Sequence, residues 1–558
     1  MRSASRPARP VPVPARVRAV RRATLPVAAI SAIALVAACS GPPKKDEAKQ
    51  AEDYKLSAGT PAAAGPIDAF RWALYAEPLT LDYTQAFDYP QNTVLSNVCE
   101  SLMRWTPQLT VAPGLAEKAS NPDPTTWVYD LRSGVTFHDG SPMTAEDVVF
   151  SVGRQMDPEV GAAWADSFEN VDSVTATGPL QVTFKLKKAD SLFPQLMATA
   201  AGVVAGKKGV EASGTDYGTD GSLSCTGPYR LGDWAKGQSL KLERNDGYWG
   251  TKAHAKTVEF KFLTDPSART NAMLSGDVDG GFLIPTESYA RLRDSGVGTL
   301  YFGEGLSTVN VNVTSMEGPL GDVRVRQAMS LALDRTGFVQ TALAGNGTVT
   351  NSLTPKASWA NAPAAAKAAA FDALPPTAQD IEKARQLVKD AGAEGKKLVV
   401  ATSPIGLDVS LLATALHAAG SEIGLDVELK TIAPDAFSAL FTDPAAREGI
   451  DMFPETYYLS VTDPFDLLRN FRTGAYQNHA GYSNPAYDEL VDQITATYDP
   501  AKRFELTAKL QKLAGDEMLW LPVAEWPSSV FLNKKITGAP TTISYMYYPW
   551  AADVGAAG

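Results

Sequence analysis

The stretch Trp127–Val152, WVYDLRSGVTFHDGSPMTAEDVVFSV, contains a turn signal followed directly by a helix signal. Asp139-Gly140 suits a turn with positive φ, and Pro142 stands shortly before the expected helix. Thr144 opens that helix, and the acid three residues later completes a capping box. We therefore predict a tight turn and then a helix, with His138 beside the turn in a packing or capping role rather than as a metal ligand.

Strand and helix patterns alternate along the rest of the chain. Apolar residues alternate with polar ones in LQVTFKLK (180–187), VEFKF (258–262) and LDVELK (425–430), which predicts strands. Val325, Ala328, Met329 and Ala332 share one helical face. Thr377 is expected to open a further helix, TAQDIEKARQLVKDAG, which stops at Gly392. The predicted fold class is therefore mixed α/β.

The amino-terminal 65 residues do not look like part of a folded core. Seven of the first 22 residues are arginine, and the apolar run Leu25–Ala38 is too short to span a bilayer. These features are typical of an export signal, and Val36–Cys39 resembles the bacterial lipobox, which makes Cys39 the expected lipidation site. We expect a signal peptide at 1–38 and a flexible tether at 39–65. Arg21-Arg22 leaves the Sec and twin-arginine export routes both open.

Composition and motifs exclude several classes of function. The formal net charge of −11 disfavours nucleic acid as a partner. The sequence has no GxSxG elbow and no Walker loop, and its four histidines are scattered without an HExxH or CxxC motif. We expect no catalytic residues, no metal and no cofactor. The roughly 490 residues after the tether are too many for one hydrophobic core and predict at least two domains.

Seven stretches, taken in order, resemble the large solute-binding proteins of bacterial ABC importers, solute-binding family 5. They include CTGPYRLGDW (225–234), LERNDGYWG (242–250), DPSARTNAMLSGDVDGG (265–281), PLGDVRVRQAMSLALDR (319–335), KARQLVKDAG (383–392) and GYSNPAYDELV (481–491), together with the opening stretch. The resemblance implies a two-lobe periplasmic-binding-protein-like fold, type II, cluster C. It places lobe one at 66–303, including an extra subdomain at about 96–215, lobe two at 304–512, and a return to lobe one at 513–558.

The resemblance also implies where a solute binds. In peptide-binding members an aspartate three residues before a DP step holds the ligand's amino terminus; here the step is Asp463-Pro464 and Ser460 stands in that place. In dipeptide-binding members an arginine in a loop of lobe two holds the ligand's carboxylate. The matching loop here is ATSPIGLDVS (401–410), and it contains no arginine. A free dipeptide is therefore a doubtful ligand, and a longer peptide, a blocked peptide or a neutral oligosaccharide stays open.

Neighbouring residues complete the expected cleft. Tyr457 and Tyr458 adjoin Ser460, and Trp359 lies in a loop; each is expected either to stack on the solute or simply to pack. Asn310 and Asn312, in STVNVNV (307–313), are two residues apart on one strand and so share a face, which the resemblance turns toward the cleft.

The function implied is that of a lipid-anchored binding component of an ABC importer. It would bind a peptide-like solute at the outer face of the cytoplasmic membrane, as a monomer, and deliver it to separate permease and ATPase chains. A peptide-signal receptor on the same fold is an alternative, and a tethered hydrolase is disfavoured by the missing motifs.

Cys99 and Cys225 are the two cysteines besides Cys39. Both stand in family motifs where another residue is usual, and an exported chain meets an oxidising compartment. We predict that they form a disulfide within lobe one, with two buried free thiols as the alternative.

Overall fold

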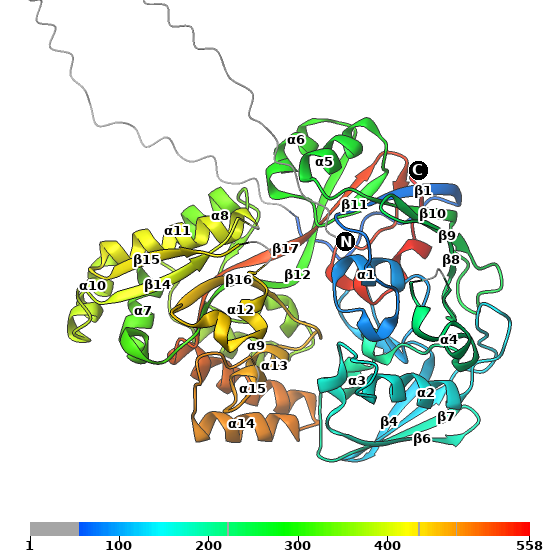
Figure 1. The fold of residues 1–558 in the computed structure, drawn as a ribbon, viewed down its shortest axis with the longest axis horizontal. Helices are drawn as coiled ribbons and strands as arrows, with labels where there is room; N and C mark the ends of the chain where they lie inside the picture. The colour runs from blue at the N-terminus through cyan, green and yellow to red at the C-terminus, as the bar shows by residue number, and fades with distance from the viewer. Residues whose placement is uncertain (1–54, 220–221, 405, 434–435, 476) are drawn as a thin grey trace, which may run out of the picture. The chain divides into compact units, whose positions relative to one another are not determined.

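One sheet of eleven strands organises the chain in the computed structural model, which describes residues 55–219, 222–404, 406–433, 436–475 and 477–558. The predicted signal peptide and the predicted lipidation site Cys39 lie outside the described residues. The strand order is β15-β14-β16-β12-β17-β11-β1-β10-β9-β8, with β13 paired to β17 (Figure 1). The bounds are β1 (Ile67–Leu74), β8 (Tyr229–Ala235), β9 (Ser239–Arg244), β10 (Ala255–Phe262), β11 (Gly280–Phe282), β12 (Gly298–Val313), β13 (Thr348–Val349), β14 (Lys397–Thr402), β15 (Asp426–Thr431), β16 (Met452–Tyr458) and β17 (Trp520–Asn533).

The two long strands β12 and β17 join the two lobes. They run antiparallel through the centre of Figure 1, and their register shifts between Gly303 and Ser307 of β12. On one side of the shift, β17 also pairs with β11, which belongs to lobe one. On the other side, β12 also pairs with β16, which belongs to lobe two. The predicted boundary at 303/304 coincides with this shift, although the domain limits as a whole remain a prediction.

Lobe two surrounds the parallel strands β14, β15 and β16. Its helices and the short segments near them are α7 (Val323–Ala332), α8 (Arg335–Ala342), α9 (Ala364–Asp372), α10 (Ile381–Asp390), α11 (Leu407–Glu422) and α12 (Ala439–Thr442). Val325, Ala328, Met329 and Ala332 are buried as their spacing predicts. The helix expected from Thr377 begins instead at Ile381, because the Asp380 side chain accepts a hydrogen bond from the Lys383 amide and forms the cap.

Lobe one contains β1 in parallel between β10 and β11, with β9 and β8 added antiparallel. A separate four-stranded sheet, with α2 packed on it, lies at the lower right of Figure 1. The remaining elements here are β2 (Met103–Trp105), β3 (Val111–Pro113), β4 (Ala116–Asp123), β5 (Thr126–Leu131), β6 (Val171–Gly178), β7 (Gln181–Leu186), α1 (Tyr89–Leu95), α2 (Ala145–Met156), α3 (Phe193–Leu196), α4 (Lys207–Ser213), α5 (Pro266–Ser275), α6 (Tyr289–Asp294), β18 (Ile536–Thr537) and β19 (Gly555–Ala556).

The opening stretch forms the turn and the helix that its residues predict. Gly140 has a φ of 87°, and Thr144 caps α2 in a capping box with Asp147. Nε2 of His138 donates to the Gly227 carbonyl at 3.1 Å, and burial lowers the pKa of His138 to about 4. The histidine is therefore a neutral packing residue at neutral pH, in agreement with the sequence prediction.

The disulfide Cys99–Cys225 is present, as predicted. It joins the segment after α1 to the segment that carries Gly227. The Gly227 amide donates to the Val98 carbonyl at 2.9 Å, and a Cβ at Gly227 would lie 2.5 Å from that same oxygen. Only glycine allows this approach, so Gly227 and the disulfide hold the same two segments together.

Two predicted boundaries differ from the packing of the chain. The return to lobe one was expected from residue 513, but α15 (Pro500–Asp516) runs through that point. Met518, Leu521, Val523 and Ala524 still pack in the lobe-two core, so the chain returns to lobe one within β17, after Trp526. The predicted tether also ends early, because backbone amides of Ser57, Thr60 and Ala64 donate to carbonyls of the folded body.

The segment after β16 connects the two lobes on the side away from β11. It includes α13 (Phe465–Leu468), α14 (Pro485–Thr495) and α15, whose apolar residues join the same buried cluster as lobe one. Ser191 Oγ donates to the Ile494 carbonyl at 3.1 Å, and Tyr498 Oη donates to the Pro124 carbonyl at 2.7 Å. The segment therefore packs against lobe one, and its assignment to lobe two within 304–512 stays a prediction. Among the described residues, no helix is long and apolar enough to cross a membrane.

Removing the disulfide tests its contribution to stability. The double variant Cys99→Ala/Cys225→Ala loses a crosslink across a sequence separation of 126 residues, so we expect the free energy of unfolding to fall by up to about 4–5 kcal/mol. Urea unfolding of the mature chain measures this. Reduced wild type should unfold like the variant, and two free thiols in unfolded, unreduced wild type would contradict the bond.

Candidate functional site

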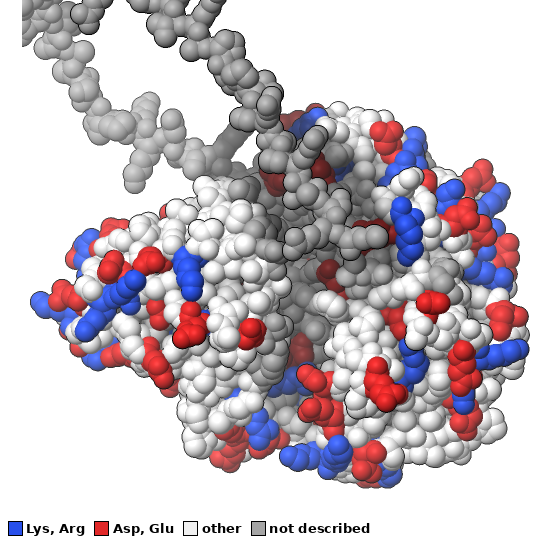
Figure 2. Space-filling view, in the orientation of Figure 1, with Lys and Arg blue, Asp and Glu red and all other residues white. Residues whose placement is uncertain are grey.

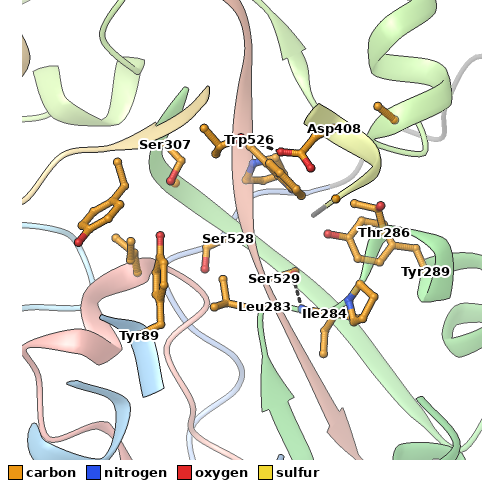
Figure 3. A pocket seen from close by; sticks show the side chains of 18 of the residues that line it. Tyr89, Leu283, Ile284, Thr286, Tyr289, Ser307, Asp408, Trp526, Ser528 and Ser529 are labelled. Carbon is orange, nitrogen blue, oxygen red and sulfur yellow. Dashed lines mark hydrogen bonds between the residues drawn. The ribbon is translucent and has the colours of Figure 1, made fainter. Parts of the chain in front are cut away.

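A cavity of about 500 Å³ lies between the two lobes, against β12 and β17, which are called the crossing strands because they run from one lobe to the other. Lobe one supplies Tyr89, the 283–289 segment, Ile543 and Tyr545; the crossing strands supply residues 305, 307 and 526–529; lobe two supplies Ala342, Gly406, Asp408, Thr456 and Tyr458. Figure 3 shows Tyr89 and Ser307 at one end, Thr286 and Tyr289 at the other, and Asp408 beside Trp526. The volume of the cavity is within the range found for small-molecule binding sites.

Aromatic rings and hydroxyl groups dominate the wall of the cavity. Trp526 and four tyrosines (Tyr89, Tyr289, Tyr458 and Tyr545) line it. Ser528 and Tyr545 are at least nine-tenths buried, and their hydroxyls have no hydrogen-bond partner among the described residues. Buried hydroxyls normally find a partner. These two are therefore available to a bound solute that carries hydrogen-bonding groups.

The carboxylate of Asp408 is the charged group that lobe two contributes. Asp408 lies in the first turn of α11, and Thr456 Oγ1 donates to its Oδ2 at 3.0 Å. A helix amino terminus stabilises an ionised carboxylate. The described residues that line the cavity include no lysine, arginine or histidine. The cavity is therefore acidic, in a surface where charges of both signs are otherwise interspersed (Figure 2).

Tyr458 is the predicted site residue that reaches this cavity. Its ring lies 5.4 Å from that of Tyr89, and its Oη donates to the Phe87 carbonyl at 3.0 Å. Both contacts connect lobe two to lobe one, and burial raises the pKa of Tyr458. Tyr457 points to the other face of β16, where its ring packs on Trp520 and its Oη accepts from Asn470 at 3.1 Å.

Asn310 and Asn312 share a face of β12, but that face does not line the cavity. Asn310 Nδ2 donates to Thr308 Oγ1 at 2.8 Å, and Asn312 Nδ2 donates to Glu455. Ser307, an odd number of residues away, is on the cavity side. The two-residue spacing was read correctly, but the assignment of that face to the cleft is wrong for this cavity.

Ser460 and Asp463 lie elsewhere along the contact between the lobes. Ser460 lines a separate cavity of about 80 Å³ with Asp190 and Asp466. Its amide donates to Asp466 Oδ2 at 2.9 Å. Asp463 is fully buried and forms an ion pair with Arg503. A ligand role for Ser460 remains a prediction, whereas Asp463 is a structural acid whose charge is already paired.

Trp359 is fully buried and does not reach the cavity. Its ring packs with those of Phe371 and Phe504, and its Nε1 donates to Thr354 Oγ1 at 2.9 Å. The stacking role considered from sequence is therefore wrong, and the packing alternative holds, because the indole fills a satellite core between α9 and α15.

Several cavity residues were missed from sequence. Asp408 belongs to the stretch ATSPIGLDVS (401–410), in which the resemblance assigns a role to an arginine and none to an acid. Trp526 and Ser528 belong to β17, the whole of which lies within the predicted return to lobe one at 513–558. Among the described residues, no group of three histidines, cysteines, aspartates or glutamates is arranged to hold a metal ion.

The comparisons with known proteins agree on one family of bacterial solute-binding proteins. Residues 110–479 match the bacterial extracellular solute-binding proteins, family 5 Middle. The chain is 25% identical over 483 residues to the nickel-binding periplasmic protein of Escherichia coli, covering 82% of this chain and 88% of that protein. It is 24% identical over 473 residues to the periplasmic oligopeptide-binding protein OppA of Salmonella typhimurium, covering 80% and 85%.

A solved structure shows the same fold. The ABC transporter substrate-binding protein CtaP of Listeria monocytogenes has a TM-score of 0.78 at 22% sequence identity, over 88% of this chain and 100% of that one. This similarity supports the two-lobe arrangement around β12 and β17.

The contrast between Tyr458 and Tyr457 can be measured. Tyr458→Phe removes a hydrogen bond between the lobes, so the closed form is less favoured and solute affinity should fall about two- to tenfold. Tyr457→Phe, which removes the hydrogen bond from Asn470 on the other face of β16, is the matched control and should bind like wild type in calorimetry with the co-purifying solute. Equal effects of the two substitutions would contradict the assigned strand faces.

Proposed function

The chain belongs to family 5 of the bacterial extracellular solute-binding proteins, and from this premise we propose that it is the lipid-anchored binding component of an ABC importer. It takes a peptide-like solute between its lobes at the outer face of the cytoplasmic membrane. It acts as a monomer and performs no chemistry on the solute, which it passes to separate permease and ATPase chains.

The observation that carries the proposal is the cavity between the lobes. Its wall combines residues of both lobes with residues of the crossing strands, so a solute placed there contacts every part that moves when such a protein opens. The Tyr458–Phe87 hydrogen bond and the Tyr89–Tyr458 ring contact join the lobes at its edge.

A peptide-like solute fits the chemistry of the wall. The unpaired hydroxyls of Ser528 and Tyr545 match the amide groups of a peptide backbone, and the aromatic rings match its side chains. The name of the Salmonella relative specifies oligopeptides, which favours the same class. Because Ser460 replaces the family's aspartate, we do not expect the free amino terminus to be the main point of attachment.

Replacing Cys39 tests the anchor. In the full precursor, Cys39→Ala removes the thiol that carries the lipid, so the body should appear in the medium or remain as uncut precursor. Cell fractionation followed by mass spectrometry of the amino terminus measures this. A variant that is cut normally and stays in the membrane would contradict the anchor.

Filling the cavity tests the binding site. Thr286→Phe introduces a ring from the lobe-one side of the cavity, where Thr286 is partly exposed. The solute that co-purifies with wild type, identified by mass spectrometry, should bind at least about tenfold more weakly. Ser421→Phe on the exposed face of α11 is the control and should bind normally. Unchanged affinity of Thr286→Phe would contradict the site.

A further inference from the structure

The cavity contains one carboxylate whose charge the described residues do not balance. Asp408 forms no ion pair with a described lysine, arginine or histidine, although the chain forms many such pairs elsewhere. Its hydrogen bond from Thr456 fixes the carboxylate beside Trp526 (Figure 3). A carboxylate that faces a cavity without a basic partner is open to a cationic group of a bound solute.

Glu287, the second acid of the cavity, differs from Asp408 because it has a basic side chain nearby. Glu287 is exposed and lies near Arg269, a buried guanidinium of α5. Burial lowers the pKa of Arg269, and the Glu287 carboxylate opposes this effect. Glu287 is therefore partly balanced by a cation of the protein itself, which leaves Asp408 as the carboxylate directed to a solute.

The groups around Asp408 suit a cation. Trp526 and Tyr289 present aromatic surfaces to the same cavity, and aromatic faces attract ammonium and guanidinium groups. The free hydroxyls of Ser528 and Tyr545 supply an independent sign that the cavity holds a polar solute. An anionic solute group would meet acids on both sides and no lining base among the described residues.

From these observations we infer that the solute carries a positively charged ammonium or guanidinium group, held by Asp408 and the neighbouring aromatic rings. This inference rests on the proposed function and names the solute class more narrowly. It places the charge recognition in the first turn of α11.

Matched pairs of probes test the inference. The first pair is an N-acetylated, C-amidated tripeptide with a central lysine and the same tripeptide with norleucine. The second pair is butylguanidinium and butylurea, which share a shape but differ in charge. Calorimetry on wild type should show at least about tenfold tighter binding of the cation in one or both pairs.

Substitution at Asp408 completes the test. Asp408→Asn keeps an oxygen that accepts from Thr456 and removes the charge, so the preference for the cation should disappear. Asp380→Asn, at the exposed cap of α10, removes an acid from another helix start in lobe two and should keep the preference.

The outcomes separate this inference from the proposed function. If the lysine and norleucine peptides bind equally, and the two members of the second pair also bind equally, the inference of a cationic solute is overturned and the proposed peptide binder remains. If wild type binds butylguanidinium more tightly than butylurea, Asp408→Asn removes this preference, and the two tripeptides bind equally, the result supports a cationic solute and contradicts a peptide-like one. A cation preference that survives in Asp408→Asn, or no cation bound more tightly in either pair, overturns the inference.

Discussion

The pairing of β12 with β17 is the constraint on which the rest of the structure depends. These strands carry one sheet from lobe to lobe, and at Gly305 of β12 their contact is too close for a side chain. A Cβ at Gly305 would lie 2.2 Å from the Trp526 carbonyl oxygen of β17. Because β17 turns Trp526, Ser528 and Ser529 toward the cavity at this point, the same contact that joins the lobes also builds the binding surface.

The contacts between the lobes divide into two kinds. Apolar packing of α13–α15 with lobe one is extensive and forms a continuous buried cluster. At the cavity edge, by contrast, single polar and ring contacts such as those of Tyr458 join the lobes. Contacts of the second kind are individually weak. At the edge of the cavity the lobes are therefore held by less packing than along α13–α15.

Much of the fold could be predicted from local signals, whereas the site could not. The capping box of α2, the Gly140 turn and the buried face of α7 are short-range features, and the structure confirms them. The disulfide was predicted because two cysteines departed together from familiar motifs. Which face of β12 meets the cavity depends on pairing with β16 and β17, and the spacing of Asn310 and Asn312 gives only that they share a face. The burial of Trp359 likewise depends on α15, more than 140 residues away.

The central claim is that a solute binds against the crossing strands between the lobes. A crystal structure of the mature chain with the solute it carries from cells tests this most directly. The account predicts that the solute occupies the cavity beside Trp526, with Ser528 hydrogen-bonded to it and the pairing of β12 with β17 unchanged. A solute found in the small cavity at Ser460, or outside both cavities, would contradict the account.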